Sequence, residues 1–451
     1  MNTANFINVC QYGVVGDGVT NNTQKIKEVI ETAEKAGGGT IYFPPGKYVT
    51  GTVELKSNMT LYIDSGAVIV GSADPADYPM ITKETLKGYN REGHSGLIKA
   101  INAENVTVTG RGVIDGQGFN WWANPKNEHR PRAVQFIMCS DVLIENVKII
   151  NSAMWTVHPM CCNNVTIDGI TIKNPSNSPN TDGINPESCS NVHISNCTID
   201  VGDDCLTLKS GTEDDEFQKQ YPCENIVVTN CTMLNGHGGV VIGSEMSGGV
   251  KNITISNCVF NGTDRGIRIK TRRKRGGNIE DVIINNILMD SVLVPFVING
   301  YYQCGGADEH DMSLFSLDPL EIEENTPYIR NINISNIRAK NVTASAGYID
   351  MIPEMPVEGL TVSNYSVDMV DTDEEMVEKP IMAFHAPFTK GEGFFCTNIK
   401  NSTFRDFSIK VINGCGMEFG NAENVRVSGI SVIGSDESVK IKEGSDVKIS
   451  F

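Results

Sequence analysis

Residues 180–211, NTDGINPESCSNVHISNCTIDVGDDCLTLKSG, contain a short apolar strand pattern between polar turns. The pattern begins at Asn191 as NVHI: an asparagine, an apolar residue, any residue and a second apolar residue. It recurs, with asparagine, aspartate or once glycine in first place, at positions 58, 105, 141, 164, 191, 225, 252, 281, 331, 359, 424 and 446. Most neighbouring copies lie 22–36 residues apart. A repeat of this length, made of short strands and polar turns, predicts a solenoid.

Each strand of the repeat is too short to bury a hydrophobic face alone. We therefore expect an all-β fold, a single-stranded parallel β-helix in which successive coils stack. Three coils carry an Asn-Cys pair, at positions 196–197, 230–231 and 257–258. In that register the three asparagines form a ladder, and the three cysteines stack inside as small buried hydrophobic residues.

An amphipathic helix is expected ahead of the coils. Asn22 can cap it, and the glycines at 37–39 can end it. Its apolar positions follow the i, i+3, i+4, i+7 spacing and are Ile26, Val29, Ile30 and Ala33.

The repeat predicts a single domain over residues 1–451. We expect a capping module over 1–80, core coils with the site over 81–370, and further coils and a loop over 371–451. Two segments, 301–327 and 371–396, interrupt the repeat.

The net charge of −18 disfavours nucleic acid or an anionic membrane as the partner. It would also repel an acidic polysaccharide unless positive charge is concentrated locally. Residues 265–275 provide such a concentration, because seven of these eleven are Lys or Arg. The sequence contains no run of 18 or more apolar residues, so it predicts no membrane span.

The N-terminus has neither a basic region nor an apolar region of the secretory kind. Thirteen cysteines in a long chain argue against a disulfide framework, and the adjacent Cys161 and Cys162 do not have zinc spacing. We expect a cytoplasmic protein, or an extracellular one if a signal has been removed, with neither a metal nor another cofactor.

The Asn-Cys pairs also set the register of polar residues. Asp203 lies six residues beyond the first cysteine, and His237 lies at the same offset in the next coil. Arg268 and Lys270 lie ten and twelve residues beyond the third cysteine, and Lys209 lies twelve beyond the first. Because stacked coils lie about 4.8 Å apart, Asp203, His237 and Arg268 should line one groove.

Two further aspartates belong to this groove. Asp182 precedes it by one coil, and Asp204 follows Asp203 directly. Gly202 permits a turn or bulge that aims both neighbouring aspartates outward. Three carboxylates in one groove repel each other, which raises the proton affinity of at least one. Paired carboxylates on a rigid scaffold are the apparatus of glycoside hydrolysis.

Four motifs resemble, in order and spacing, those of the polygalacturonases, glycoside hydrolase family 28, of the bacterial type. They are NTD at 180–182, GDD at 202–204, GHG at 236–238 and RIK at 268–270. The resemblance runs from about residue 5 to about residue 370. It implies a right-handed, pectin-lyase-like parallel β-helix that hydrolyses α-1,4-galacturonide bonds of oligo- or polygalacturonides with inversion.

The resemblance also implies residue roles. Asp203 is similar to the general acid, Asp182 and Asp204 to the groups that activate water, and His237 to the residue that tunes or holds the acid. An inverting pair such as Asp182 and Asp203 should stand roughly 6.5–9.5 Å apart. The expected substrate contacts are Arg268, Lys270, Tyr302 (or Tyr301 in the alternative alignment), Lys209 and Asn180.

Several positions carry two interpretations. The residues at 272–275 are either extra uronate contacts or a solvated loop, and Glu245 is either a ladder cap or a groove wall. We expect Trp121, Trp122 and Trp155 to pack rather than to stack on sugar.

Three alternative functions remain open. The first is a hydrolase of rhamnogalacturonan or another uronate oligosaccharide. The second is a pectate lyase, which needs acidic calcium ligands and a basic proton abstractor. The third is a non-catalytic β-helical glycan-binding or tail-fibre module. Because segments 301–327 and 371–396 could wall off one end of the groove, we expect exo action on short oligomers.

Overall fold

A computed structural model describes residues 6–86, 92–123, 129–304, 311–372 and 379–450. The chain divides into two compact units, residues 1–205 and 206–451. Each is described by itself below, and the single domain expected over 1–451 stays a prediction.

The first unit contains the expected helix, α1 (Thr23–Lys35). Its buried side chains are the four predicted apolar residues. The expected side-chain cap is wrong. Asn22 occupies the N-cap position, but its amide donates to the carbonyl oxygens of Val15 (3.0 Å) and Thr20 (2.8 Å). The backbone N–H of Thr23 is instead accepted by Asn21 Oδ1 at 3.0 Å. Glycines at 37 and 38 end the helix at positive φ, as predicted.

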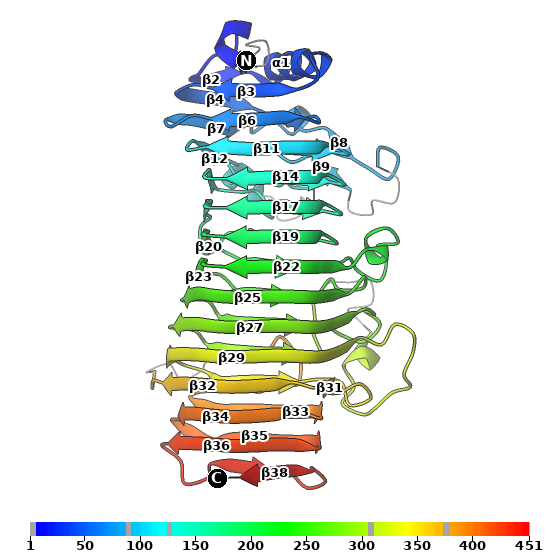
Figure 1. Ribbon diagram of the computed structural model, residues 1–451, viewed down its shortest axis with the longest axis vertical. Coiled ribbons are helices and arrows are strands. Elements are labelled where there is room, and N and C mark those ends of the chain that lie inside the picture. The colour runs from blue at the N-terminus through cyan, green and yellow to red at the C-terminus, as the bar shows by residue number, and fades with distance from the viewer. Residues whose placement is uncertain (1–5, 87–91, 124–128, 305–310, 373–378, 451) are drawn as a thin grey trace. The chain divides into compact units, whose positions relative to one another are not determined.

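Parallel strands of the first unit form three ladders, whose rungs follow one another along the chain (Figure 1). The first contains β1 (Phe6–Asn8), β3 (Gly39–Phe43), β6 (Met59–Ile63), β11 (Glu104–Gly110), β14 (Ser140–Glu145), β17 (Asn163–Asp168) and β19 (Ser190–Ser195). The second contains β2 (Asp17–Asn21), β4 (Gly46–Thr50), β7 (Ala67–Gly71), β12 (Val113–Asp115), β15 (Lys148–Ile150), β18 (Thr171–Lys173) and β20 (Thr198–Val201). The third contains β5 (Val53–Leu55), β10 (Ile98–Ile101), β13 (Val134–Ile137) and β16 (Val157–Met160).

Short elements lie between these ladders. The antiparallel pair β8 (Met80–Ile81) and β9 (Gly93–His94) and the short helix α2 (Phe119–Trp122) leave the coils. The 3-10 turns η2 (Val9–Tyr12) and η3 (Pro75–Asp77) also belong to this unit, and the second unit contains η4 (Gln218–Gln220) and η5 (Met312–Phe315).

The second unit continues the coil pattern with longer strands. One side contains β22 (Cys223–Thr229), β23 (Thr232–Asn235), β25 (Val250–Asn261), β27 (Asn278–Asp290), β29 (Tyr328–Val342), β31 (Val357–Glu358), β32 (Thr361–Met369), β34 (Thr403–Lys410), β36 (Val425–Ile433) and β38 (Val447–Ser450). The other contains β21 (Leu206–Leu208), β24 (Val240–Ile242), β26 (Arg265–Lys270), β28 (Val294–Asn299), β30 (Ser345–Asp350), β33 (Glu392–Lys400), β35 (Asn413–Glu423) and β37 (Val439–Ile441).

The first residue of each repeat copy turns the chain into its strand. From position 58 to position 424, every copy begins with a residue at positive φ, for example Asn191 at 57° and Gly359 at 68°. Asparagine and aspartate tolerate this left-handed conformation better than other side chains, and glycine adopts it freely. The choice of first residue in the repeat therefore reflects backbone geometry.

A ladder of asparagine amides follows a second turn of the coils. In the second unit, Asn286 donates to Asn257 (3.2 Å), Asn336 to Asn286 (3.0 Å) and Asn364 to Asn336 (2.7 Å). In the first unit, the Asn196 amide donates to Asp168 Oδ1 at 2.7 Å. The cysteines that follow the expected ladder are buried, as predicted: Cys197, Cys231 and Cys258.

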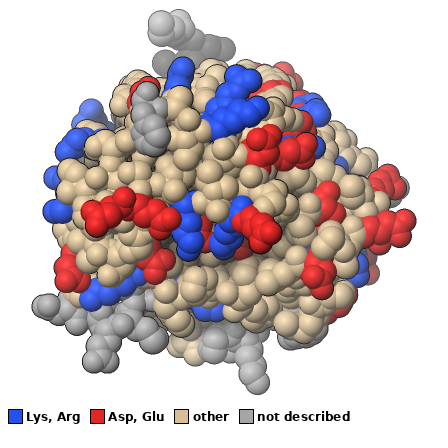
Figure 2. Space-filling model, turned by 90° about the horizontal axis from the view of Figure 1, so that it is seen from below, with Lys and Arg blue, Asp and Glu red and all other residues tan. Residues whose placement is uncertain are grey.

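Charge is distributed in small groups on the face shown in Figure 2, where basic side chains lie beside acidic ones. The net charge of −18 therefore does not exclude local positive potential. No helix among the described residues has the length and apolar character needed to cross a bilayer.

Candidate active site

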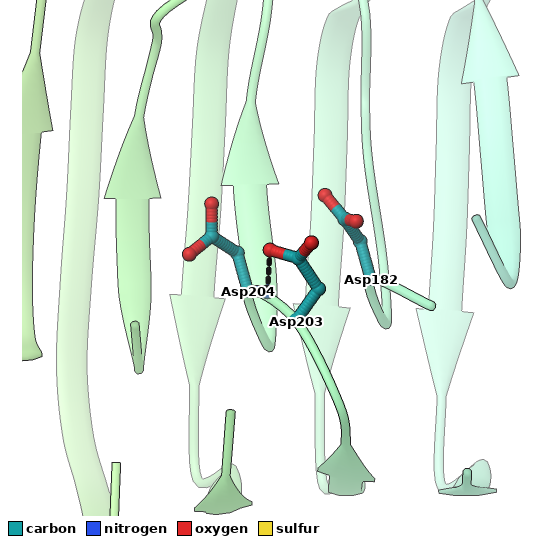
Figure 3. A group of neighbouring side chains, drawn as sticks. All are labelled: Asp182, Asp203 and Asp204. Carbon is teal, nitrogen blue, oxygen red and sulfur yellow. Dashed lines mark hydrogen bonds between the residues drawn. The ribbon is translucent and has the colours of Figure 1, made fainter. Parts of the chain in front are cut away.

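Three carboxylates meet in the first unit. One oxygen each of Asp182, Asp203 and Asp204 lies within 4.8 Å of one oxygen of the other two. Their side chains project to the same side of the chain, with Asp203 between the other two in this view (Figure 3). Asp182 and Asp204 are buried and Asp203 is half-buried. The prediction that these three residues converge is confirmed.

A bend after β20 aims both neighbouring aspartates at the cluster. The backbone N–H of Asp204 donates to Asp203 Oδ1 at 2.8 Å, which fixes the Asp203 side chain. A Cβ on Gly202 would stand 2.5 Å from the carbonyl oxygen of Ser178, so only glycine fits before the bend. The turn expected at Gly202 is therefore present.

Backbone hydrogen bonds hold Asp182 next to this bend. The N–H of Gly183 donates to the Asp204 carbonyl oxygen at 3.0 Å, and the N–H of Thr156 donates to the Asp182 carbonyl oxygen at 2.8 Å. A Cβ on Gly183 would stand 2.3 Å from the carbonyl oxygen of Cys205. The close approach of two chain segments thus sets the spacing of the carboxylates.

The spacing of the cluster suits a bound water. A water about 2.8 Å from each of two oxygens can bridge them when they stand up to roughly 4.8 Å apart. The separation of the Asp182 and Asp203 carboxyl groups as wholes, expected to be roughly 6.5–9.5 Å for an inverting pair, stays a prediction. The same oxygens could contact a cation, but Ca²⁺ takes 6–8 oxygen ligands, so further donors would have to come from water or substrate.

Asn180 lies two residues before Asp182 and its side chain is engaged. Arg130 donates to Asn180 Oδ1 (2.7 Å) and to the carbonyl oxygens of Pro179 (2.8 Å) and Ala153 (3.0 Å). Burial lowers the pKa of the Arg130 guanidinium. Arg130 thus clamps the turn that leads to Asp182, whereas a contact of Asn180 with substrate stays a prediction.

His237 and Arg268 share a cavity in the second unit. It has a volume of about 370 Å³ and is also lined by Asp264 and by residues of the 379–388 segment. The Nδ1 atom of His237 lies 2.7 Å from Asp264 Oδ2. A carboxylate at this distance fixes the orientation and tautomer of an imidazole. The groove predicted for Asp203, His237 and Arg268 together would draw on both units and stays a prediction.

Tyr302 lies beside both predicted cations. Its ring centroid is 5.7 Å from Arg268 Cζ and 5.0 Å from Lys270 Nζ. Tyr301, in contrast, is 1% exposed and packs edge-on against His385. The geometry favours Tyr302 over Tyr301 in the alternative alignments.

Lys209 forms a buried ion pair. Its Nζ lies 2.9 Å from Glu245 Oε2. The Glu245 carbonyl oxygen also accepts the Ser210 N–H at 2.7 Å. Glu245 therefore holds Lys209. Both interpretations of Glu245, and a substrate contact by Lys209, stay predictions.

The basic run at 272–275 is largely buried, so the solvated loop is wrong. Glu213 accepts from both Arg272 (2.7 Å) and Arg275 (2.6 Å). Arg273 pairs in a bidentate manner with Glu354, at 2.6 and 2.8 Å. The three arginines are fixed in ion pairs, which speaks against their role as extra uronate contacts.

The tryptophans pack, as predicted. Trp121 packs edge-on against Tyr78, and Trp155 packs against His158. The Trp122 indole donates to the Ala153 carbonyl oxygen at 3.2 Å.

Sequence reasoning missed several residues around these groups. Asp264 lies directly before the strand β26 and belongs to none of the four motifs. Arg130 lies outside the four motifs. Residues 379–388 belong to a segment that does not contain the repeat. The segment was expected to wall off one end of the groove, and it lines the cavity in the second unit.

Known proteins resemble this chain over most of its length. The sequence matches glycosyl hydrolases family 28 over residues 76–383. A probable polygalacturonase of Vitis vinifera is 34% identical over 379 residues, which cover 81% of this chain and 75% of the relative. Because plant and bacterial proteins are both similar, the bacterial type stays a prediction.

Solved structures agree in fold. A hyperthermoactive exopolygalacturonase from Thermotoga maritima has a TM-score of 0.70 and 31% identity, covering 80% of this chain and 86% of that one. A family 28 exopolygalacturonase from Yersinia enterocolitica has a TM-score of 0.77 at 21% identity, covering 93% and 78% of the two chains. The predicted fold class, an all-β right-handed parallel β-helix with an N-terminal helix, is confirmed. The chain belongs to glycosyl hydrolases family 28 and is a glycoside hydrolase.

Proposed function

We propose that the protein hydrolyses α-1,4-galacturonide bonds of oligo- or polygalacturonides. The observation that carries this proposal is the carboxylate cluster, in which three oxygens lie within 4.8 Å of one another in a family 28 chain. The relatives named polygalacturonase support the galacturonide, and the cations Arg268 and Lys270 beside Tyr302 suit the carboxylate of a uronate.

In this mechanism Asp203 donates a proton to the leaving oxygen. It is the most accessible of the three aspartates, so it can reach the glycosidic oxygen. Asp182 and Asp204 are buried and orient and deprotonate the attacking water. The three groups share protons as a coupled set. Within the second unit, His237 is held by Asp264, and Arg268 and Lys270 beside Tyr302 suit a uronate carboxylate; the support of the acid by His237 stays a prediction.

Replacing Asp203 by Asn tests the assignment of the acid. Hydrolysis of trigalacturonate should fall by about 10³-fold, since general acid catalysis is lost. Binding of the trimer, measured by calorimetry, should persist. Wild-type protein that binds galacturonides without cleaving them would contradict hydrolysis and favour the glycan-binding alternative.

Inversion is part of the proposal, and the stereochemistry of the first product tests it. Water activated by Asp182 and Asp204 and attacking opposite the leaving group gives a β-anomer from an α-bond. Early appearance of the α-anomer in proton NMR spectra would contradict inversion.

Exo action on short oligomers is also proposed. The 379–388 segment at the cavity and the exopolygalacturonase at 31% identity support it. Digestion of a long oligogalacturonide should release monomer from the start, whereas a ladder of intermediate sizes would contradict exo action. The same assay on rhamnogalacturonan oligomers tests that alternative. A product that absorbs in the ultraviolet, and whose formation stops when a chelator is added, would indicate a lyase.

A further inference from the structure

Residues 379–388 line one side of the cavity that contains His237 and Arg268. None of these ten residues lies in a strand of the coils. They are nevertheless held on the outside of the second unit by contacts at the beginning of the segment, at Met382 and at His385.

The beginning and the middle of the segment are fixed by side chains of the coils. The guanidinium of Arg265 donates to the carbonyl oxygens of Lys379 and Pro380, the latter at 3.1 Å. The amide of Asn299 donates to the Met382 carbonyl oxygen at 3.2 Å. These bonds place the segment directly over β26 and β28.

A third anchor of the segment is its histidine, three residues before Phe388. His385 Nε2 lies 2.6 Å from Asp350 Oδ2, and its ring packs edge-on against Tyr301 at 4.8 Å. Met382 completes the contact from the middle, where its sulfur accepts from Arg268 Nη2 at 3.0 Å. The segment is therefore a built wall of the cavity.

Two side chains of this wall have the chemistry of a sugar-acid site. Phe388 is 52% exposed, and Lys379 Nζ lies 5.9 Å from its ring centroid. Among the described residues, the ammonium donates to the carbonyl oxygens of Ala383 (3.2 Å) and Phe384 (2.9 Å). An ammonium has three N–H donors, so a third donor remains for a ligand.

We propose that Lys379 and Phe388 form a second uronate subsite, adjacent to the sugar bound at His237 and Arg268. The apolar face of the sugar ring lies on Phe388, and its carboxylate pairs with the Lys379 ammonium. Small-ligand sites combine such an apolar surface with a few placed polar groups, and cavities from about 300 Å³ upward serve this purpose. The inference rests on the proposed galacturonide hydrolysis and extends it to recognition of chain length.

The test compares substrates that differ by one sugar. The value of kcat/KM is measured on di-, tri- and tetragalacturonate for the wild-type protein, Phe388→Ala and Lys379→Met. Both variants should lose about tenfold in kcat/KM on the oligomers that reach the subsite, through KM. Activity on the dimer should be unchanged, because the dimer fills only the positions on either side of the cleaved bond.

Three controls separate the outcomes. Lys379→Arg keeps the charge and should retain most of the preference for longer oligomers. Phe6→Ala and Lys25→Met change exposed residues of the first unit and should leave kcat/KM unchanged on every oligomer. Thermal unfolding midpoints equal to that of the wild type show that the wall variants are folded.

Equal losses on dimer and longer oligomers, or no loss on any of them, would overturn the second subsite. A wild-type protein that cleaves no galacturonide would instead contradict the proposed function. The two failures are thus distinguishable.

Discussion

Arg130 clamps the turn that leads to Asp182, one of the aspartates proposed to activate water. Its three hydrogen bonds fix Pro179, Asn180 and Ala153, and Asn180 sits at a φ of +54°. Arg130→Ala removes these donors and should lower kcat about tenfold with little change in KM, because small misplacements of reacting groups are costly. Steady-state kinetics on trigalacturonate measure both constants.

Two variants complete the Arg130 experiment. Arg130→Lys restores the charge but not the planar fork, so its kcat should lie between the other two. Arg330→Ala removes an exposed arginine paired with Glu280 and should leave kcat unchanged. A rise in KM at constant kcat would show that this turn binds substrate and does not position Asp182.

The turns of the coils are the elements by which the repeat can be recognised in the sequence. Asn286 has a φ of +56° and lies between Asn257 and Asn336 in the ladder. Asn286→Gly loses the amide but adopts this φ freely. Asn286→Ala should be more destabilising than the glycine variant by about 1 kcal/mol, since it also pays for a left-handed conformation.

Thermal unfolding of both variants measures the difference. Asn333→Ala, at an exposed position in the extended strand β29, is the matched control and should be nearly neutral. Equal destabilisation by alanine and glycine would mean that the amide ladder, and not the backbone conformation, selects asparagine at these turns.

The buried pair of Arg273 and Glu354 stabilises the region next to β26. Burial raises the pKa of Glu354, but the hydrogen bonds and the charge of Arg273, together with backbone hydrogen bonds, outweigh it, so the pKa is lowered from its ordinary value of 4.5. A lowered carboxyl pKa contributes stability that is fully present above 4.5 and is lost as the pH falls through the folded-state value. Glu354→Gln should therefore cost about 3 kcal/mol at neutral pH, and the difference from wild type should shrink in acid.

Unfolding midpoints measured from neutral pH to below pH ~4 follow this difference. Glu216→Gln, in an ion pair whose glutamate is 75% exposed, should cost less than about 1 kcal/mol at any pH. A Glu354→Gln deficit that stays constant in acid would show that the pair contributes through shape and not through charge.

The elements also show where sequence reasoning ends. The coils are predictable because each copy needs one left-handed residue and two inward apolar residues, and both needs are local. The partners of the arginine run are not local, since Glu213 precedes Arg272 by 59 residues and Glu354 follows Arg273 by 81. The sequence consequently reads as a charged loop where the structure has buried ion pairs. The position of residues 379–388 also depends on partners far away in the sequence, such as Arg265 and Asn299. The sequence alone shows only that this segment lacks the repeat.

At the scale of the whole molecule, a net charge of −18 opposes a polyanionic substrate that the local cations attract. The two effects differ in range. At about 0.01 M ionic strength the Debye length is about 30 Å, so a long polygalacturonate feels the repulsion of the entire protein; at about 0.15 M the length is about 8 Å, and mainly contacts near the site remain.

Added salt should therefore act in opposite directions on long and short substrates. For polygalacturonate, kcat/KM should rise between these two ionic strengths, because screening removes the long-range repulsion. For digalacturonate it should fall, since the short substrate gains mainly from nearby cations such as Arg268, whose attraction is also screened. Initial rates in sodium chloride, with potassium chloride as the control for ion identity, measure both trends. A fall of kcat/KM for both lengths would mean that the local cations, and not the net charge, govern the approach of substrate, and a rise for both would mean the reverse.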